Sequence, residues 1–321
     1  MILHHDKETF NDLIETTASF LRIPAVFIEK DYWVTYILYK LSKSDYKETA
    51  IFKGGTSLSK AYKIIERFSE DIDLAVITDT LDGNAVKTLI KSIEKRLLDE
   101  NFEEVTTPQT SKGSKFRKTV HQYPQIIEGN FGHANENLIL ELNSFAKPHP
   151  YLKKTITSYI YDFLNAQNDE AKELIADFQL EPFEVNVLDY KRTFCEKLSA
   201  IARASFESDK EYTQLKDKIR HFYDIYYLLQ EEEIQAFIKR DEIIQMIANV
   251  REDDQKQFSA EWSNVKLHTT KIFQNPNILD DLASYYNSNF KTLVYADALP
   301  TIEDIKNEFQ KLSWVLKEKD L

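Results

Sequence analysis

A glycine pair followed by two closely spaced aspartates is the feature that most constrains this chain. Gly54 and Gly55 follow an apolar run that ends at Lys53, and an amphipathic segment separates them from a second apolar run with Asp71 and Asp73. Glycine permits backbone conformations that other residues avoid, and it lets a ligand approach the backbone closely. The order predicts a strand, a turn, a helix and a second strand that carries the aspartates.

The spacing of the aspartates predicts a shared face. Because side chains alternate along a strand, Asp71 and Asp73 leave the same side, and Ile72, Leu74 and Val76 pack into the core from the other side. Two converging carboxylates are ligands that Mg²⁺ prefers. We therefore expect a metal platform on the aspartate face, although an exposed edge strand would show the same alternation.

The glycine turn is the expected phosphate-binding element. Gly54 and Gly55 let the backbone take a positive φ beside an anion, and Thr56 or Ser57 can cap the following helix so that its N–H groups face that anion. By itself, a glycine pair before a helix is commonly just a tight turn. The turn and the aspartates together predict a site for a metal-bound triphosphate.

Five segments occur in an order that is typical of one enzyme family. They are Glu29–Thr35, Gly54–Thr56, Arg67–Asp73, Glu196–Ala200 and Arg220–Asp224. Together they resemble the AbiEii/AbiGii toxin nucleotidyltransferases, a branch of the DNA polymerase β-like superfamily, from about residue 8 to residue 230. The resemblance implies a polymerase β-like nucleotidyltransferase core with a mixed sheet.

The resemblance also implies roles for individual residues. Asp71 and Asp73 would hold a catalytic Mg²⁺, and Ser69 would lie beside them at the mouth of the site. Lys197 would contact the nucleotide phosphates, and Asp224 would match the aspartate of the family's final motif.

The chain departs from the family pattern in two places. Cys195 stands where serine is usual, and Gly55 lies farther from Asp71 than in the tightest superfamily pattern. A lone cysteine in a helix is usually a small buried hydrophobe rather than a nucleophile. Neither departure removes a metal ligand.

Two of the implied site residues also have simple structural explanations. Apolar residues recur at helical spacing between Tyr190 and Ser205, which puts Lys197 on the flank of a buried stripe, where a solvated lysine is the ordinary outcome. Asp224 lies four residues after Arg220, and an i,i+4 ion pair would explain both. Their functional assignment depends on the resemblance.

A third carboxylate is expected on a later strand. The segment Leu138–Phe145 is the best apolar run after Asp73, and its alternation places Glu141 and Asn143 on the polar face. Glu141 is therefore the candidate third carboxylate of the site, as a metal ligand and as a catalytic residue. A half-buried glutamate paired with a nearby lysine fits the pattern equally well.

The predicted fold class is α+β, in three parts. They are N-terminal helices (residues 1–48), an α/β nucleotidyltransferase core (49–189) and a helical C-terminal domain (190–321). Helices are expected near Asp6–Leu21, Ala25–Leu41, Ser57–Glu66, Gly83–Leu98, Lys218–Gln230, Asp241–Val250, Ile278–Tyr286 and Thr301–Leu316. The segment Pro148–Pro182 is interpreted as a mostly helical connector. Lys30 and Asp31 either contact the nucleotide or simply cap and flank an amphipathic helix.

Composition indicates where the protein acts and what it can bind. The single cysteine among 321 residues excludes an intrachain disulfide, and no apolar run approaches the ~20 residues that a bilayer crossing needs. We expect a cytoplasmic protein without membrane contact. A formal net charge of −12 disfavours nonspecific nucleic-acid binding, yet one basic cluster could form either a local RNA contact or a solvated loop. It comprises Lys112, Lys115, Arg117, Lys118, His121, Lys147, His149, Lys153 and Lys154.

The predicted activity is Mg²⁺-dependent transfer of a nucleotide from an NTP to an acceptor hydroxyl, with Glu141 or a second metal helping that hydroxyl to lose its proton. The resemblance implies that the acceptor is a tRNA 3′ end or another RNA. It also implies the toxin of a bacterial toxin–antitoxin system of the abortive infection type, limited by a separately encoded antitoxin. The alternatives are transfer to a protein or small molecule, and an inactive interaction module of the same fold.

Overall fold

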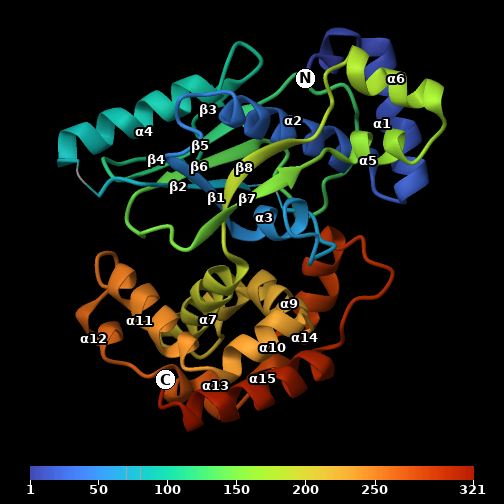
Figure 1. Cartoon of the computed structure of the whole chain (residues 1–321). Helices are drawn as coiled ribbons and strands as arrows, with labels where there is room; N and C mark the ends of the chain where they lie inside the picture. Colours follow the sequence, from blue (N-terminus) through green and yellow to red (C-terminus); the bar gives the residue numbers. More distant parts are fainter. Residues whose placement is uncertain (70, 80) are drawn as a thin grey trace. The chain divides into compact units, whose positions relative to one another are not determined.

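The chain folds into two compact units (Figure 1). The computed structural model describes residues 1–69, 71–79 and 81–321, so Glu70 of the predicted motif lies outside the described residues. The first unit contains Met1–Lys63 and Phe68–Leu188, and the second contains Ile64–Arg67 and Asp189–Leu321. The N-terminal helices thus group with the sheet, and four residues of the first half of the chain group with the C-terminal helices.

The first unit is built on one mixed sheet. Its strands in the described residues are β1 (Ala50–Lys53), β2 (Asp71–Val76), β3 (Glu103–Val105), β4 (Ser111–Lys112), β5 (Phe116–Gln122), β6 (Leu138–Asn143), β7 (Tyr151–Ile156) and β8 (Phe183–Leu188). Their order is β3-β5-β6-β2-β1-β8-β7, with β4 beside β5. β2 runs antiparallel to β1 and parallel to β6, and β1 runs parallel to β8. The predicted mixed sheet is confirmed, and β2 lies at its centre.

The helices of the first unit pack around this sheet. They are α1 (Lys7–Leu21), α2 (Ala25–Ser42), α3 (Gly54–Lys60), α4 (Gly83–Leu97), α5 (Tyr159–Asn165) and α6 (Asp169–Asp177). α2 contacts both β8 and α4, and α4 contacts β6, so these two helices cover one face of the sheet (Figure 1). The α+β fold class is confirmed.

Helix α2 is buried on nearly all sides. Its apolar residues are buried as expected, but the side chains of Glu29, Lys30 and Asp31 are buried as well, with exposed fractions of 0, 0 and 4%. The expected helix is present, but the interpretation of it as amphipathic is wrong. A helix can bury charges when each of them has a partner, and these three do, as described below.

Helix α3 is shorter than expected and begins earlier. It begins at Gly54 and ends at Lys60, whereas the apolar spacing predicted Ser57–Glu66. Lys63 has a φ of 56°, which a right-handed helix does not accommodate. The chain therefore turns away before the predicted end.

The segment Pro148–Pro182 is not simply a helical connector. It begins with β7, which pairs antiparallel with β8 along its whole length, and only then forms α5 and α6. The β7 residues Tyr-Leu-Lys-Lys-Thr-Ile do not alternate in polarity, so the strand carries no period-two signal. Pairing with a strand that is distant in sequence specifies it instead.

The described residues of the second unit are predominantly helical. Its α-helices are α7 (Tyr190–Glu207), α8 (Thr213–Lys216), α9 (Ile219–Leu228), α10 (Glu232–Lys239), α11 (Glu242–Asp254), α12 (Ala260–Ser263), α13 (Lys271–Gln274), α14 (Ile278–Ser288) and α15 (Ile302–Glu318). Arg67 joins this unit through a β-bridge to Val294. Among all the described helices, none has the length and apolar character that spanning a bilayer requires.

Candidate active site

Carboxylates and lysines form a row across the centre of the sheet. Asp73 is in register with Lys53 on β1 and with Glu141 on β6, and Glu141 is in register with Lys118 on β5. Side chains of residues in register on neighbouring strands share a face, about 5 Å apart. Asp71 lies on this face too, two residues before Asp73 on the same strand. We call these five residues the acid row.

The opposite face of β2 is part of the core. Ile72 and Leu74 are completely buried, whereas Asp71 and Asp73 are partly exposed. The structure confirms the alternation that the sequence predicted. Ser69 lies half-buried in the segment that leads into the strand, and its role stays a prediction.

The glycine turn lies directly against Asp73. Gly54 has a φ of 80°, in the left-handed region that favours glycine. A Cβ atom at this position would lie 2.1 Å from Oδ2 of Asp73, far inside van der Waals contact. Both the backbone conformation and the neighbouring carboxylate therefore require glycine here. The turn and Asp73 therefore lie directly against each other, as a single candidate site requires.

Two hydroxyl groups hold the turn in place. Thr56 Oγ1 donates to the backbone carbonyl of Asp71, and Ser57 Oγ donates to the carbonyl of Gly54 at 2.9 Å. The N-cap of α3 is Lys53, without a side-chain capping bond, so the expected capping by Thr56 or Ser57 is wrong. These hydroxyls tie the turn to the strand that carries the aspartates. Gly55 lies in the first turn of α3.

Glu141 fits both interpretations that the sequence left open. Its carboxylate lies 3.7 Å from the ammonium group of Lys118, which makes it a partly buried glutamate with a lysine partner. Burial raises its pKa above the ordinary value; the charges of Lys118 and Lys53 oppose this rise, and that of Asp71 adds to it. Glu141 is therefore also a destabilised carboxylate beside the aspartates.

The donor set fits a divalent cation that shares its ligands with a substrate. No group of three or more His, Cys, Asp or Glu side chains in the described part of the chain is arranged to hold a metal. Mg²⁺ in nucleotide sites commonly uses one or two carboxylates and completes its shell with phosphate oxygens and water. Asp71 and Asp73 provide such a pair, and added positive charge would relieve the crowding of carboxylates. Glu141 as a third ligand stays a prediction.

Lys197 and Asp224 meet inside the second unit. The Nζ atom of Lys197 lies 2.8 Å from Oδ2 of Asp224, and Arg67 binds the same carboxylate through Nε and Nη2, each at 2.7 Å. The three side chains are at most 8% exposed. Lys197 is therefore not the solvated lysine of the simple explanation. Its contact with nucleotide phosphates stays a prediction.

The charges of this cluster are strongly coupled. Burial alone would raise the pKa of Asp224, but Arg67 and Lys197 outweigh it and hold that pKa well below its ordinary value. Burial also lowers the pKa of the neighbouring His221 well below its ordinary value, and Lys197 adds to this effect, so the imidazole is neutral at pH 7. Cys195 is buried, as expected, and burial raises the pKa of its thiol, which leaves it unsuited to act as a nucleophile.

Sequence reasoning did not find the part that Arg67 plays. It stands in a recognised segment, yet its partner Asp224 lies 157 residues away. An ion pair between such distant residues leaves no periodic signal. The lysines of the acid row were missed for the same reason, because strand register is a property of the folded sheet.

Three consecutive charged residues of α2 each bind a different segment of the first unit. The carboxylate of Glu29 accepts hydrogen bonds from the backbone N–H groups of Ile126 and Ile127, at 2.7 and 3.0 Å. The ammonium group of Lys30 donates to the carbonyl of Asn137 at 2.8 Å, at the entry to β6. α2 therefore braces the segment that leads into the strand of the candidate third carboxylate.

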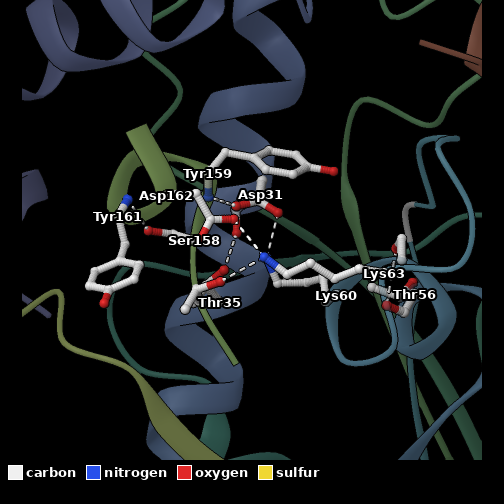
Figure 2. Close-up of polar contacts among 11 residues, drawn as sticks. Asp31, Thr35, Thr56, Lys60, Lys63, Ser158, Tyr159, Tyr161 and Asp162 are labelled. Atoms are coloured by element: carbon white, nitrogen blue, oxygen red, sulfur yellow. Dashed lines mark hydrogen bonds and ion pairs between the residues drawn. The ribbon is translucent and has the colours of Figure 1, made fainter. Parts of the chain in front are cut away.

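Asp31 links α2 to α3 and to α5 (Figure 2). Its Oδ1 pairs with Nζ of Lys60, the last residue of α3, at 2.5 Å, and its Oδ2 accepts from the backbone N–H of Tyr159 at 2.9 Å. Burial raises the pKa of Asp31 despite both contacts. Nearby, Lys63 pairs with Asp162 at the surface. Glu29, Lys30 and Asp31 thus connect α2 to the elements around the acid row.

The fold and the site define a class of protein. A central strand with two aspartates lies beside a glycine turn on a mixed sheet, as the resemblance to nucleotidyltransferases implied. The family model described as "Nucleotidyl transferase AbiEii toxin, Type IV TA system" matches residues 36–308, which is more than half of the chain. The chain belongs to this family and is a nucleotidyltransferase, and the family implies an NTP substrate and an antitoxin partner.

Two solved structures are similar over most of the chain. The crystal structure of JHP933 from Helicobacter pylori has 13% sequence identity and a TM-score of 0.44, covering 91% of this chain and 92% of its own. That of a "putative nucleotidyltransferase" from H. pylori has 13% identity and a TM-score of 0.45, covering 91% and 94%. No match was found among curated proteins.

Substitution of Gly54 tests the contact between the turn and Asp73. In Gly54→Ala, the positive φ and the approach to Oδ2 of Asp73 should lower the free energy of unfolding by more than about 1 kcal/mol. The new methyl group should also displace the Asp73 carboxylate and remove nucleotidyl transfer. Urea denaturation and NTP incorporation measure the two effects. Gly83→Ala is the control, because a Cβ there meets nothing within 4 Å; equal activity of both variants would contradict the assignment.

Removal of the buried ion pair between Asp31 and Lys60 tests the link from α2 to α3. Lys60→Met leaves the buried Asp31 carboxylate without its cation and should cost about 3–5 kcal/mol in urea denaturation. Lys63→Met removes the surface pair with Asp162 and should cost less than about 1 kcal/mol. Similar losses for the two variants would show that burial does not distinguish these pairs.

Asp224→Asn tests the buried cluster of the second unit. It leaves Arg67 and Lys197 buried without a counter-charge and should cost about 3–5 kcal/mol of unfolding free energy at pH 7. Asp241→Asn, at a side chain that is 94% exposed, is the matched control and should change it little.

The same cluster predicts a pH dependence. The pKa of Asp224 is lowered in the folded protein, so its contribution is complete above the ordinary value of 3.8 and is lost as the pH falls further. The stability difference between wild type and Asp224→Asn should therefore be constant above about pH 5 and shrink below pH 4. A difference that grows on acidification would refute this pairing.

Proposed function

We propose that the protein transfers a nucleotide, with Mg²⁺, from an NTP to the 3′-terminal hydroxyl of a tRNA or another RNA. In this proposal it is the toxin of a bacterial toxin–antitoxin system and acts in the cytoplasm, where NTPs and tRNA are found, until a separately encoded antitoxin limits it. The observation that carries the proposal is the contact of Gly54 with Asp73, which joins the glycine turn to the aspartate pair.

The residues of the first unit have distinct tasks in this reaction. Asp71 and Asp73 hold the cation, and the Gly54 turn lets the triphosphate approach the backbone. When bound, Mg²⁺ polarises the α-phosphate and neutralises charge on the leaving group. Glu141, which lies in register with Asp73 on the neighbouring strand, accepts the proton of the acceptor hydroxyl. The acceptor oxygen bonds to the α-phosphorus, the bond to the bridging oxygen breaks, and pyrophosphate leaves.

The RNA acceptor rests on the family resemblance and on no geometric observation. A formal net charge of −12 favours a different acceptor, a protein or a small molecule, because RNA binding usually draws on clustered lysine and arginine. The mass of the labelled product separates these classes. Label in a tRNA band supports the proposal, and label in protein or in a small product supports the alternative.

Removal of both aspartates tests the chemistry. Asp71→Asn with Asp73→Asn keeps the size of the side chains and removes the ligand charge, so incorporation of labelled NTP into total RNA should fall by at least about a hundredfold. Circular dichroism should be unchanged. Each NTP is supplied in turn with Mg²⁺, and full incorporation by this variant would defeat the assignment.

The same variant tests toxicity in cells. Expression of the wild-type protein should arrest bacterial growth, and the aspartate variant should not. Equal growth of both strains would count against a toxin, even if transfer is observed in vitro.

A further inference from the structure

Strand alternation divides the basic cluster around β5. Arg117 points to the face covered by α4, where its Nε and Nη2 atoms lie 2.9 and 2.6 Å from Oε2 of Glu94, and it is only 6% exposed. His121 lies on the same face of the strand and is buried, and burial lowers its pKa, so it is neutral at pH 7. Lys118 alone among these three points to the acid row. The part of the cluster on β5 is therefore neither a solvated loop nor a continuous basic patch.

Lys118 is held loosely compared with its neighbour Arg117. Its Nζ lies 3.7 Å from Oε2 of Glu141, beyond the 2.7–3.2 Å of a hydrogen bond. The side chains of Lys118 and Glu141 are 25% and 24% exposed. The ammonium group of Lys118 therefore keeps donors for a ligand and has access to solvent, whereas the guanidinium of Arg117 is buried and binds Glu94 through two nitrogens.

The charges of the acid row explain why a lysine belongs there. Its three carboxylates outnumber its two ammonium groups, which leaves the acid row with one formal negative charge. A divalent cation reverses that sign, and the face then attracts a polyphosphate. Without the lysines, the carboxylates would repel the nucleotide more strongly.

We propose that Lys118 binds a phosphate group of the substrate NTP and serves as the counter-ion of Glu141 while the site is empty. This inference rests on the proposed function and deepens it. In the free protein, the ammonium group of Lys118 neutralises part of the acid row. With a cation bound by the aspartates, Lys118 would no longer be needed as a counter-ion and could bind a phosphate of the NTP, since it lies in register with Glu141 on the face that carries Asp71 and Asp73.

The proposal predicts opposite effects on two ligands. Lys118 repels a divalent cation but attracts a nucleotide, so its removal should strengthen cation binding and weaken nucleotide binding. A lysine that only supports the fold would weaken both or neither. The two affinities therefore separate a substrate-binding role from a structural one.

The experiment measures both affinities by calorimetry on the full chain. Mn²⁺ is titrated without nucleotide, and an ATP analogue with a non-cleavable α,β-bridge is titrated with Mn²⁺ present. In Lys118→Met we expect Mn²⁺ to bind about three- to tenfold more tightly and the analogue about ten- to hundredfold more weakly. Lys118→Arg should restore analogue binding. Lys115→Met, at an exposed residue just before β5, is the matched control and should leave both affinities unchanged.

Each outcome decides the proposal. Unchanged analogue binding in Lys118→Met, or Mn²⁺ binding that is unchanged or weaker, would overturn it. Lys118→Gln, which keeps a polar side chain at the position, gives the same comparison if the methionine variant does not fold. A wild-type protein that binds neither Mn²⁺ nor the analogue would overturn the proposed function together with this inference. Binding by wild type with no difference in the variants would overturn the role of Lys118 alone.

Discussion

The close approach of Gly54 to the carboxylate of Asp73 is the constraint on which the site depends. A side chain at residue 54 would occupy the space of Oδ2, and its backbone would have to adopt a φ of 80°. The glycine turn, which is the candidate phosphate-binding element, and the aspartates, which are the candidate metal ligands, therefore belong to a single candidate site. The hydrogen bond from Thr56 Oγ1 to the backbone carbonyl of Asp71 also ties the turn to the strand that carries the aspartates.

Buried charges connect the elements around this site. Glu29, Lys30 and Asp31 of α2 are desolvated, and each binds a segment distant in sequence, so that α3 and the entry to β6 are held by one helix. Buried ion pairs are poor sources of net stability because desolvation opposes the Coulomb attraction. Their loss is costly all the same, since it leaves a buried charge without a partner. Such contacts specify one arrangement of the elements.

Much of the site could be predicted because it depends on local patterns. Alternation alone placed Asp71 and Asp73 opposite Ile72, and it selected Glu141 on β6. Other features have no local signal. β7 does not alternate and is defined by its pairing with β8, and the helical spacing that predicted Ser57–Glu66 carried no sign of the positive φ that ends α3 early.

By itself, the sequence determined the fold class, the family resemblance and the face on which the aspartates stand, because periodicity and short motifs are carried by neighbouring residues. Only the tertiary structure decided which charges meet. The register that aligns Lys53, Asp73, Glu141 and Lys118 arises from four strands, and the pair of Arg67 with Asp224 joins residues 157 positions apart. These pairs form only when the chain folds, because a charge that is buried without a partner carries a large free-energy cost.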